Sequence, residues 1–115
     1  PQKELEIECI TLVDFIDKNN IERIDLMKID VETHEPEVLE GMGEYLDKLK
    51  SDFLIEIWDE ACAVKLNALF KGKGYIYFDI DDKNDVVTQK DEISVSSFWN
   101  YLICKPETAK KIGLI

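Results

Sequence analysis

Two short apolar runs, separated by a segment with helical periodicity, constrain the fold of this 115-residue chain more than any other feature. The first run extends from Ile24 to Val31 and the second from Phe53 to Trp58. Between them, apolar residues recur at helical intervals: Val38, Leu39, Met42, Leu46 and Leu49. A strand, a helix and a second strand in this order form a βαβ unit with parallel strands. The sequence therefore predicts a parallel sheet covered by helices.

The same reading predicts another helix and two more strands downstream. The helix is indicated by the spacing of Cys62, Leu66, Leu69 and Phe70, and it ends at Gly72–Gly74. The third strand is Tyr75–Ile80, and the last is Phe98–Cys104, which Lys105 and Pro106 stop. A polar turn at 81–85 and an extended loop at 91–97 lie between them. The expected order is βαβαββ in an α/β fold, with three parallel strands and one antiparallel strand.

The N-terminal segment and the helix starts carry further local signals. Alternation of Leu5, Ile7 and Cys9 with glutamates predicts a half-buried strand from Leu5 to Ile10. Thr11 then begins a short helix that Asn19 and Asn20 close. Before the longer central helix, Thr33 is expected to cap the first turn, into which Pro36 fits.

Charge and cysteine content exclude several classes of function. The formal net charge is -11 with no basic run, so nucleic acids and anionic membrane surfaces are poor partners. No stretch approaches the roughly 18 apolar residues that a membrane span needs. Cys9, Cys62 and Cys104 are odd in number and far apart, which favours reduced, buried thiols and a cytoplasmic location.

The densest polar group follows the first apolar run. Asp30, Glu32 and His34 lie where a strand ends and a helix begins, which is where ligands bind in open α/β sheets. Asp30 and Glu32 are candidates for orienting or deprotonating a hydroxyl, and His34 titrates in the useful range. A purely structural role is equally open for Asp30 and Glu32, because carboxylates in a first helical turn also stabilise the helix dipole. A lone surface histidine is the simpler interpretation of His34.

The block from Lys28 to Gly41 resembles the signature of FkbM-type methyltransferases, K-I-D-V-E-G-x-E followed by V-L-x-G. Thr11–Phe15 resembles the T-L-D-D-F block of that family, and Phe53–Ile57 and Gly74–Tyr75 resemble its next strand and its G-Y turn. The resemblance covers about residues 7 to 80 and is specific in the central block.

This resemblance implies a Rossmann-like class I methyltransferase fold that transfers a methyl group from S-adenosylmethionine to oxygen. The acceptor would be a small hydroxylated metabolite or a sugar. On this mapping the catalytic candidates are Asp30, Glu32 and His34, and the cofactor would contact Asp30 and Val31. The substrate side would be lined by Glu35, Glu56 and Trp58.

Two departures from the family pattern bear on these expectations. Thr33 stands where the family usually has glycine, so a turn that requires a positive φ would be strained there. Residues 1–115 also contain no glycine-rich loop after a strand and no acid that ends a second strand to bind a ribose. The chain starts without Met. We therefore expect one partial domain over 1–115, the C-terminal half of a methyltransferase domain, which is inactive alone.

Three alternatives remain at this point. A divalent cation held by the acids could acidify the acceptor hydroxyl, but the helix start after Val31 argues against one shared face for Asp30, Glu32 and His34. A truncated methyltransferase fold could serve as a non-catalytic interaction domain. An unrelated acid-cluster hydrolase is more distant. As partners we expect a small-molecule acceptor, together with self-association or pairing with the missing N-terminal half through the edge of the first strand.

Overall fold

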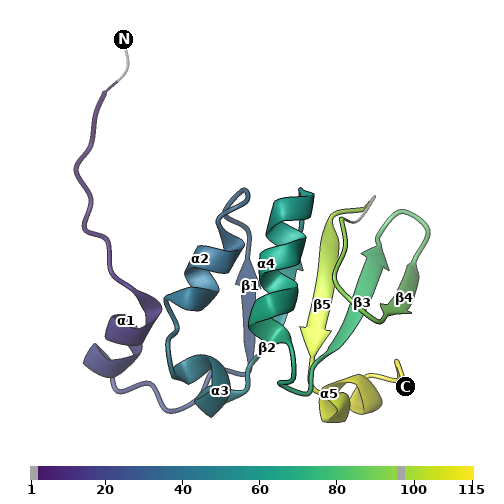
Figure 1. The fold of residues 1–115 in the computed structure, drawn as a ribbon. Coiled ribbons are helices and arrows are strands. Elements are labelled where there is room, and N and C mark those ends of the chain that lie inside the picture. Colours follow the sequence, from purple (N-terminus) through teal and green to yellow (C-terminus); the bar gives the residue numbers. More distant parts are fainter. Residues whose placement is uncertain (1–2, 96–97) are drawn as a thin grey trace.

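A computed structural model describes residues 3–95 and 98–115, and over these residues the chain forms a mixed sheet flanked by helices (Figure 1). The strands follow the order β1-β2-β5-β3-β4 across the sheet, with bounds β1 (Leu26–Ile29), β2 (Asp52–Glu56), β3 (Ile76–Asp81), β4 (Val86–Lys90) and β5 (Asn100–Cys104). β1 is parallel to β2, whereas β5 is antiparallel to both β2 and β3. β1, β2 and β3 therefore run in the same direction, as the sequence predicts.

The order βαβαββ is not reproduced, because β4 adds a strand that the sequence did not predict. β4 pairs antiparallel with β3 and is exposed along its whole length. The connecting turn is the predicted polar one, in which Asp81 Oδ1 accepts the backbone N–H groups of Lys83 and Asn84 at 3.1 Å. The loop after β4 is irregular over 91–95, and Ser96 and Ser97 lie outside the described residues.

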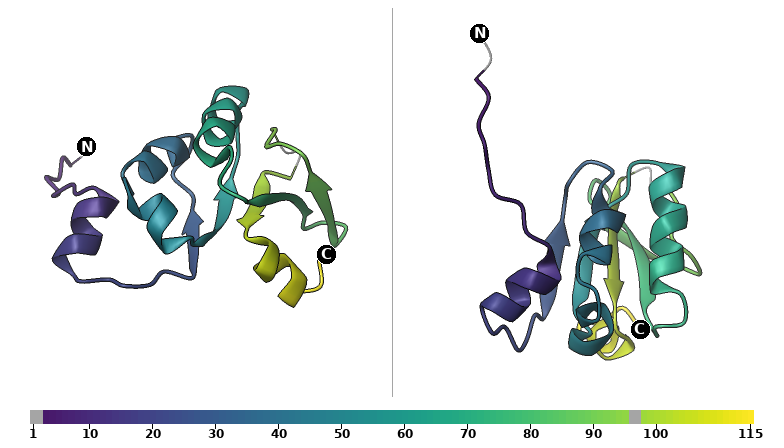
Figure 2. Two further views of the ribbon diagram at one scale, coloured as in Figure 1. Left: turned by 60° about the horizontal axis from the view of Figure 1, so that its bottom comes forward. Right: turned by 60° about the vertical axis from the view of Figure 1, so that its left-hand side comes forward.

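Helices cover the two faces of the sheet unequally. α2 (Glu35–Glu40), α3 (Tyr45–Leu49) and α4 (Glu60–Phe70) lie on one face, and α5 (Pro106–Lys111) lies on the other (Figure 2). The larger core lies under α2 and α4 and includes Leu39, Phe53, Ile55, Leu66, Phe70, Tyr101 and Ile103. Under α5 a smaller cluster contains Phe78, Cys104 and Ala109. Within the described ranges, no helix is long and apolar enough to cross a membrane.

The single central helix expected from Val38 to Leu49 is two helices, because the chain turns between them at Gly41 and Gly43. Gly43 has a φ of +54°, and a Cβ there would lie 3.6 Å from Val13. The Gly41 carbonyl accepts the Val13 N–H at 2.7 Å, so the break also anchors α1 (Leu12–Lys18). Each half keeps its apolar side toward the core.

Two predicted features of the N-terminal region are wrong. Residues 3–11 form no strand and extend away from the sheet (Figure 1), with Leu5 85% exposed. Alternation specifies which side chains share a face but provides no neighbouring strand, so the segment has no ladder to join. Cys9 is consequently exposed, whereas Cys62 and Cys104 are buried free thiols as predicted.

The predicted start and end of α1 are confirmed. Thr11 Oγ1 accepts the Asp14 N–H at 3.3 Å, and Asn19 is the C-cap. For α2, the cap prediction is wrong, because His34 occupies the N-cap position without a side-chain hydrogen bond and Thr33 precedes it. Pro36 lies in the first turn, as expected.

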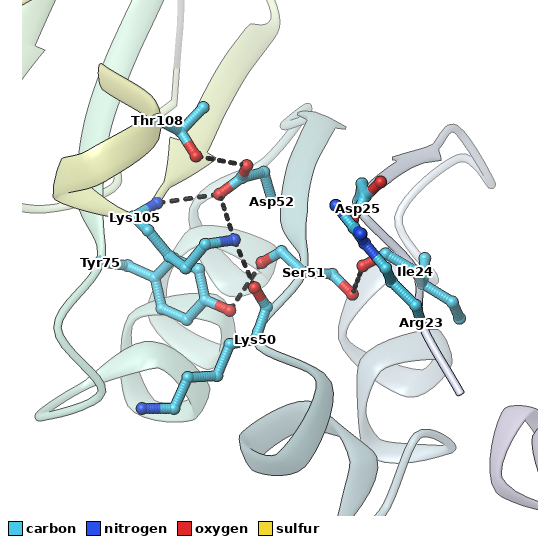
Figure 3. A network of polar contacts seen from close by, with 9 residues as sticks. All are labelled: Arg23, Ile24, Asp25, Lys50, Ser51, Asp52, Tyr75, Lys105 and Thr108. Carbon is cyan, nitrogen blue, oxygen red and sulfur yellow. Dashed lines mark hydrogen bonds and ion pairs between the residues drawn. The ribbon is translucent and has the colours of Figure 1, made fainter. Parts of the chain in front are cut away.

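α5 was not predicted, and a buried acid at the amino end of β2 holds it in place (Figure 3). Asp52 Oδ1 accepts the Lys105 backbone N–H at 2.9 Å, and Oδ2 accepts the Thr108 hydroxyl at 2.7 Å. The Lys105 ammonium lies 3.2 Å from Asp52 and donates to the Lys50 carbonyl at 2.5 Å. We call the contacts of Asp52 with Lys105 and Thr108 the Asp52 clasp. It lies at the opposite end of the sheet from Asp30, so it does not cover the carboxyl ends of β1 and β2.

Candidate functional site

Asp30 and Glu56 are neighbouring carboxyl groups at the carboxyl ends of β1 and β2. Because Ile29 pairs with Ile55 in the parallel ladder, the next residues on the two strands lie side by side. The pKa of Glu56 is raised, first by hydrogen bonding to Asp30 and then by burial. Hydrogen bonding from the Trp58 side chain has the opposite effect and offsets part of this increase in the pKa of Glu56. The neighbouring Asp30 carboxyl thus favours the protonated form of the Glu56 carboxyl.

A third acid, Glu35, is fully buried and organises the turn after β1. Its Oε2 accepts the Val31 backbone N–H at 2.8 Å. Between these two residues the chain takes left-handed conformations at Glu32 and Thr33, with φ values of 48° and 81°. Such conformations cost free energy and persist where surrounding contacts enforce them. Glu35 thus holds the strained turn that follows Asp30.

Cys62 closes the inner side of this acidic site. Its thiol donates to Glu35 Oε1 across 3.7 Å, and its backbone N–H donates to Asp59, the N-cap of α4, at 2.8 Å. Burial, followed by the charge of Glu35, raises the pKa of Cys62 to about 12. The thiol therefore stays protonated near neutral pH and is a hydrogen-bond donor rather than a nucleophile.

Two tryptophans stand beside the acid pair. The rings of Trp58 and Trp99 are stacked, with centroids 5.5 Å apart and an interplanar angle of 19°. The Ile57 N–H donates to the Trp99 carbonyl at 2.6 Å, which joins the end of β2 to the segment before β5. Trp58 was predicted from the sequence and Trp99 was not. Trp99 precedes the last strand, which was predicted to be antiparallel to the others. Pairing of that strand with β2 would have placed Trp99 near the end of β2, so this pairing was the signal that could have identified it.

The remaining predicted residues lie away from this group. Glu32 and His34 are exposed on the turn, and His34 Nδ1 lies 3.9 Å from Glu37 Oε2 with 74% of the His34 side chain accessible. Val31 is partly exposed and contacts Glu35 through its backbone. The structure therefore brings together Asp30, Glu35, Glu56 and Trp58, and it leaves Glu32 and His34 on the surface.

A hollow of about 580 Å³ runs along β1 and is lined in part by Asp30. Its lining is mostly apolar, and Asp30 and Lys28 are its charged residues; the lining residues are Leu12, Met27, Lys28, Ile29, Asp30, Val31 and Val38. β1 is an edge strand of the sheet, so this hollow opens outward. In the part of the chain that the structure describes, no group of three or more His, Cys, Asp or Glu residues is arranged to hold a metal ion.

Comparison with known proteins places these features in a family. The model of the methyltransferase FkbM domain matches residues 1–77. The methyltransferase sdnD of Sordaria araneosa is 39% identical over 56 residues, which are 48% of this chain and 22% of the length of that relative. No solved structure matches the chain. Because the family model covers more than half of the sequence, including the acidic turn after β1, the chain belongs to the FkbM methyltransferase domain family.

Proposed function

We propose that this chain forms the acceptor side of the active site of an S-adenosylmethionine-dependent O-methyltransferase. The acceptor would be a small hydroxylated metabolite or a sugar. Membership of the FkbM family supports methyl transfer. The observation that carries the proposal is the Asp30–Glu56 pair, because it lies at the carboxyl ends of two parallel strands, where α/β enzymes bind ligands.

The residues along β1 suit the cofactor that the family implies. The lining of the hollow combines apolar residues, which include Leu12 and Val38, with the acidic residue Asp30. An apolar wall matches a purine face, and a carboxylate matches hydroxyl, amine and positively charged groups. When bound, S-adenosylmethionine would supply a methyl group activated by a positively charged sulfur. Asp30 and Val31 are the residues of this chain that would line its pocket.

The acid pair would handle the proton of the acceptor. The acceptor oxygen would take the methyl group as the carbon–sulfur bond of the sulfonium breaks and leaves a neutral thioether, and the proton of the acceptor O–H would pass to the carboxyl pair. A raised pKa brings Glu56 closer to the working pH, which makes it a better base than an ordinary carboxylate. Glu35 contributes indirectly, since it holds the turn that places Asp30. In-line methyl transfer otherwise demands mainly correct positioning.

The test is methyl transfer by the protein that carries this chain, measured with radiolabelled S-adenosylmethionine and a panel of hydroxylated acceptors. Asp30→Asn should lower kcat by about 10²–10⁴-fold, the usual contribution of a general base, with little change in the urea unfolding midpoint. Glu60→Gln, which alters an exposed acid at the start of α4, should leave kcat unchanged. Equal turnover of Asp30→Asn and the parent protein would remove Asp30 from the reaction.

A further inference from the structure

We propose that Trp58 and Trp99 form a stacking platform that selects a hydroxylated ring, neutral or cationic, as the methyl acceptor. This inference rests on the proposed function, because the platform adjoins the acid pair that would take the proton. It adds Trp99 to the site and gives the acceptor a chemical class.

The exposure of both tryptophans is the first argument. Tryptophan is highly buried on average, and this chain has two tryptophans, which are 45% and 52% exposed. The core is filled instead by phenylalanine and tyrosine, such as Phe53 and Tyr101. The rings of Trp58 and Trp99 stack on each other, which leaves an outer aromatic face for a ligand ring. Two large rings at one end of the sheet are therefore available for binding.

The backbone at Trp99 is the second argument. Trp99 has a φ of 72°, which is rare for a bulky residue. Its carbonyl is fixed by the Ile57 N–H at 2.6 Å, so the unusual conformation is imposed by the end of β2. Strained conformations of this kind concentrate at binding and catalytic sites. Here the strain brings the Trp99 ring against Trp58.

The link from the platform to the acid pair is the third argument. Trp58 lies two residues beyond Glu56 at the end of β2, and the Trp58 side chain lowers the pKa of Glu56. Glu56 in turn lies beside Asp30 in the register of β1 with β2. The tryptophan platform and the proposed base are thus neighbours along the carboxyl end of the sheet. A ring stacked on the tryptophans would present an edge hydroxyl toward the carboxyl groups.

Charge decides the class of ring. The end of the sheet near the platform carries the acids Asp30, Glu56 and Asp59, and the chain as a whole has a net charge of -11. A phosphate or carboxylate on the acceptor would be repelled there. A neutral ring is accepted, and a cation gains from both the acids and the aromatic faces. Sugars and phenols share this chemistry when they lack anionic groups.

Intrinsic fluorescence of the 115-residue chain tests the platform directly, because both tryptophans belong to it. The probes are methyl glucoside, glucosamine, phenol and, as the anionic arm, glucuronate. We expect saturable changes with the first three and none with glucuronate at the same ionic strength. Trp99→Leu should weaken binding about tenfold, whereas Trp99→Phe should retain most of it. The matched control Val64→Ala removes an exposed apolar side chain of α4 and should leave the affinity unchanged.

The outcomes separate this inference from the proposed function. If no ring compound gives a saturable change, the platform is overturned whatever the methyl transfer assay reports. If rings bind in a manner that depends on Trp99 but no acceptor is methylated, the proposed function fails and the binding site stands. A signal that changes with protein concentration alone would show that a second copy covers the tryptophans, which also overturns the platform.

Discussion

At the scale of single residues, Glu56 shows how burial and a neighbouring acid change a side chain. Its pKa lies above the ordinary value of 4.5, so the folded chain binds this proton more tightly than the unfolded chain does. The resulting stabilisation is complete below pH 4.5 and is lost as the pH rises through the folded-state value. A carboxyl whose pKa is perturbed in this way, at the carboxyl end of a strand, is typical of a functional site.

Replacing Glu56 with glutamine should remove this pH dependence. The unfolding free energy of the wild type minus that of Glu56→Gln should decrease as the pH increases from about 4 to 7, because only the wild type loses the proton of Glu56. Urea denaturation at constant ionic strength measures this difference. Glu40→Gln, an exposed acid on α2, is the control and should give a flatter curve. A difference that increases with pH would show that the folded state does not favour protonated Glu56.

At the scale of elements, the turn between β1 and α2 adopts a conformation that its sequence disfavours. Thr33 is β-branched and has a φ of 81°, in the left-handed region that glycine tolerates best. The expectation that threonine would be strained at this position is confirmed. The contact from Glu35 to Val31 spans the turn and compensates for part of the cost.

Thr33→Gly should stabilise the fold by about 1 kcal/mol, because it relieves the strained φ. The measurement is the urea midpoint at neutral pH. Thr88→Gly makes the same chemical change on the exposed strand β4 and should instead destabilise, since glycine loses more entropy in a strand. Loss of stability in both variants would mean that the turn stores no relievable strain.

The attachment of α5 is a second element whose stability depends on one side chain. Asp52→Ala should cost about 2–3 kcal/mol, because it removes the acceptor for Lys105 and Thr108 at a site shielded from water. Amide hydrogen exchange should show loss of protection in α5 before the rest of the sheet. Asp25→Ala, which breaks an exposed pair with Arg23, should change the stability far less. Similar losses of stability in Asp52→Ala and Asp25→Ala would show that the Asp52 clasp does not hold α5 in place.

At the scale of the whole molecule, β1 is the edge strand of the sheet that faces an open hollow. Leu26 is exposed and Val31 is partly exposed along this edge. Unpaired backbone groups on an edge strand invite another chain to pair with them. Residues 3–11 do not cover the edge, because they extend away from the sheet (Figure 2).

We therefore predict that the 115-residue chain associates through β1. Light scattering should give a mass above that of the monomer, and association should strengthen with salt because the net charge of -11 is then screened. Leu26→Lys should restore the monomer by placing a charge at the edge. Val64→Lys, on the exposed side of α4, is the matched control and should leave the mass unchanged. A monomeric mass at all salt and protein concentrations would rule out pairing through β1.

The sequence by itself determined the features that depend on neighbouring residues. Apolar periodicity located β1, β2 and β3, and the cap at Thr11 and the turn at Asp81 follow from short-range hydrogen bonding. The acidic turn after β1 was recognised because its residues are consecutive. The motif also indicated the family before any contact was known.

Only the tertiary structure decided which distant residues meet. The register of β1 with β2 places Glu56 beside Asp30, and the antiparallel return of β5 places Trp99 against Trp58. The same long-range pairing leaves residues 3–11 without a partner despite their strand-like alternation. A local pattern specifies which face a side chain takes, whereas its neighbour across the sheet depends on chain closure over tens of residues. Sequence alone could therefore supply Asp30, Glu56 and Trp58 as candidates, but neither their arrangement nor the contribution of Trp99.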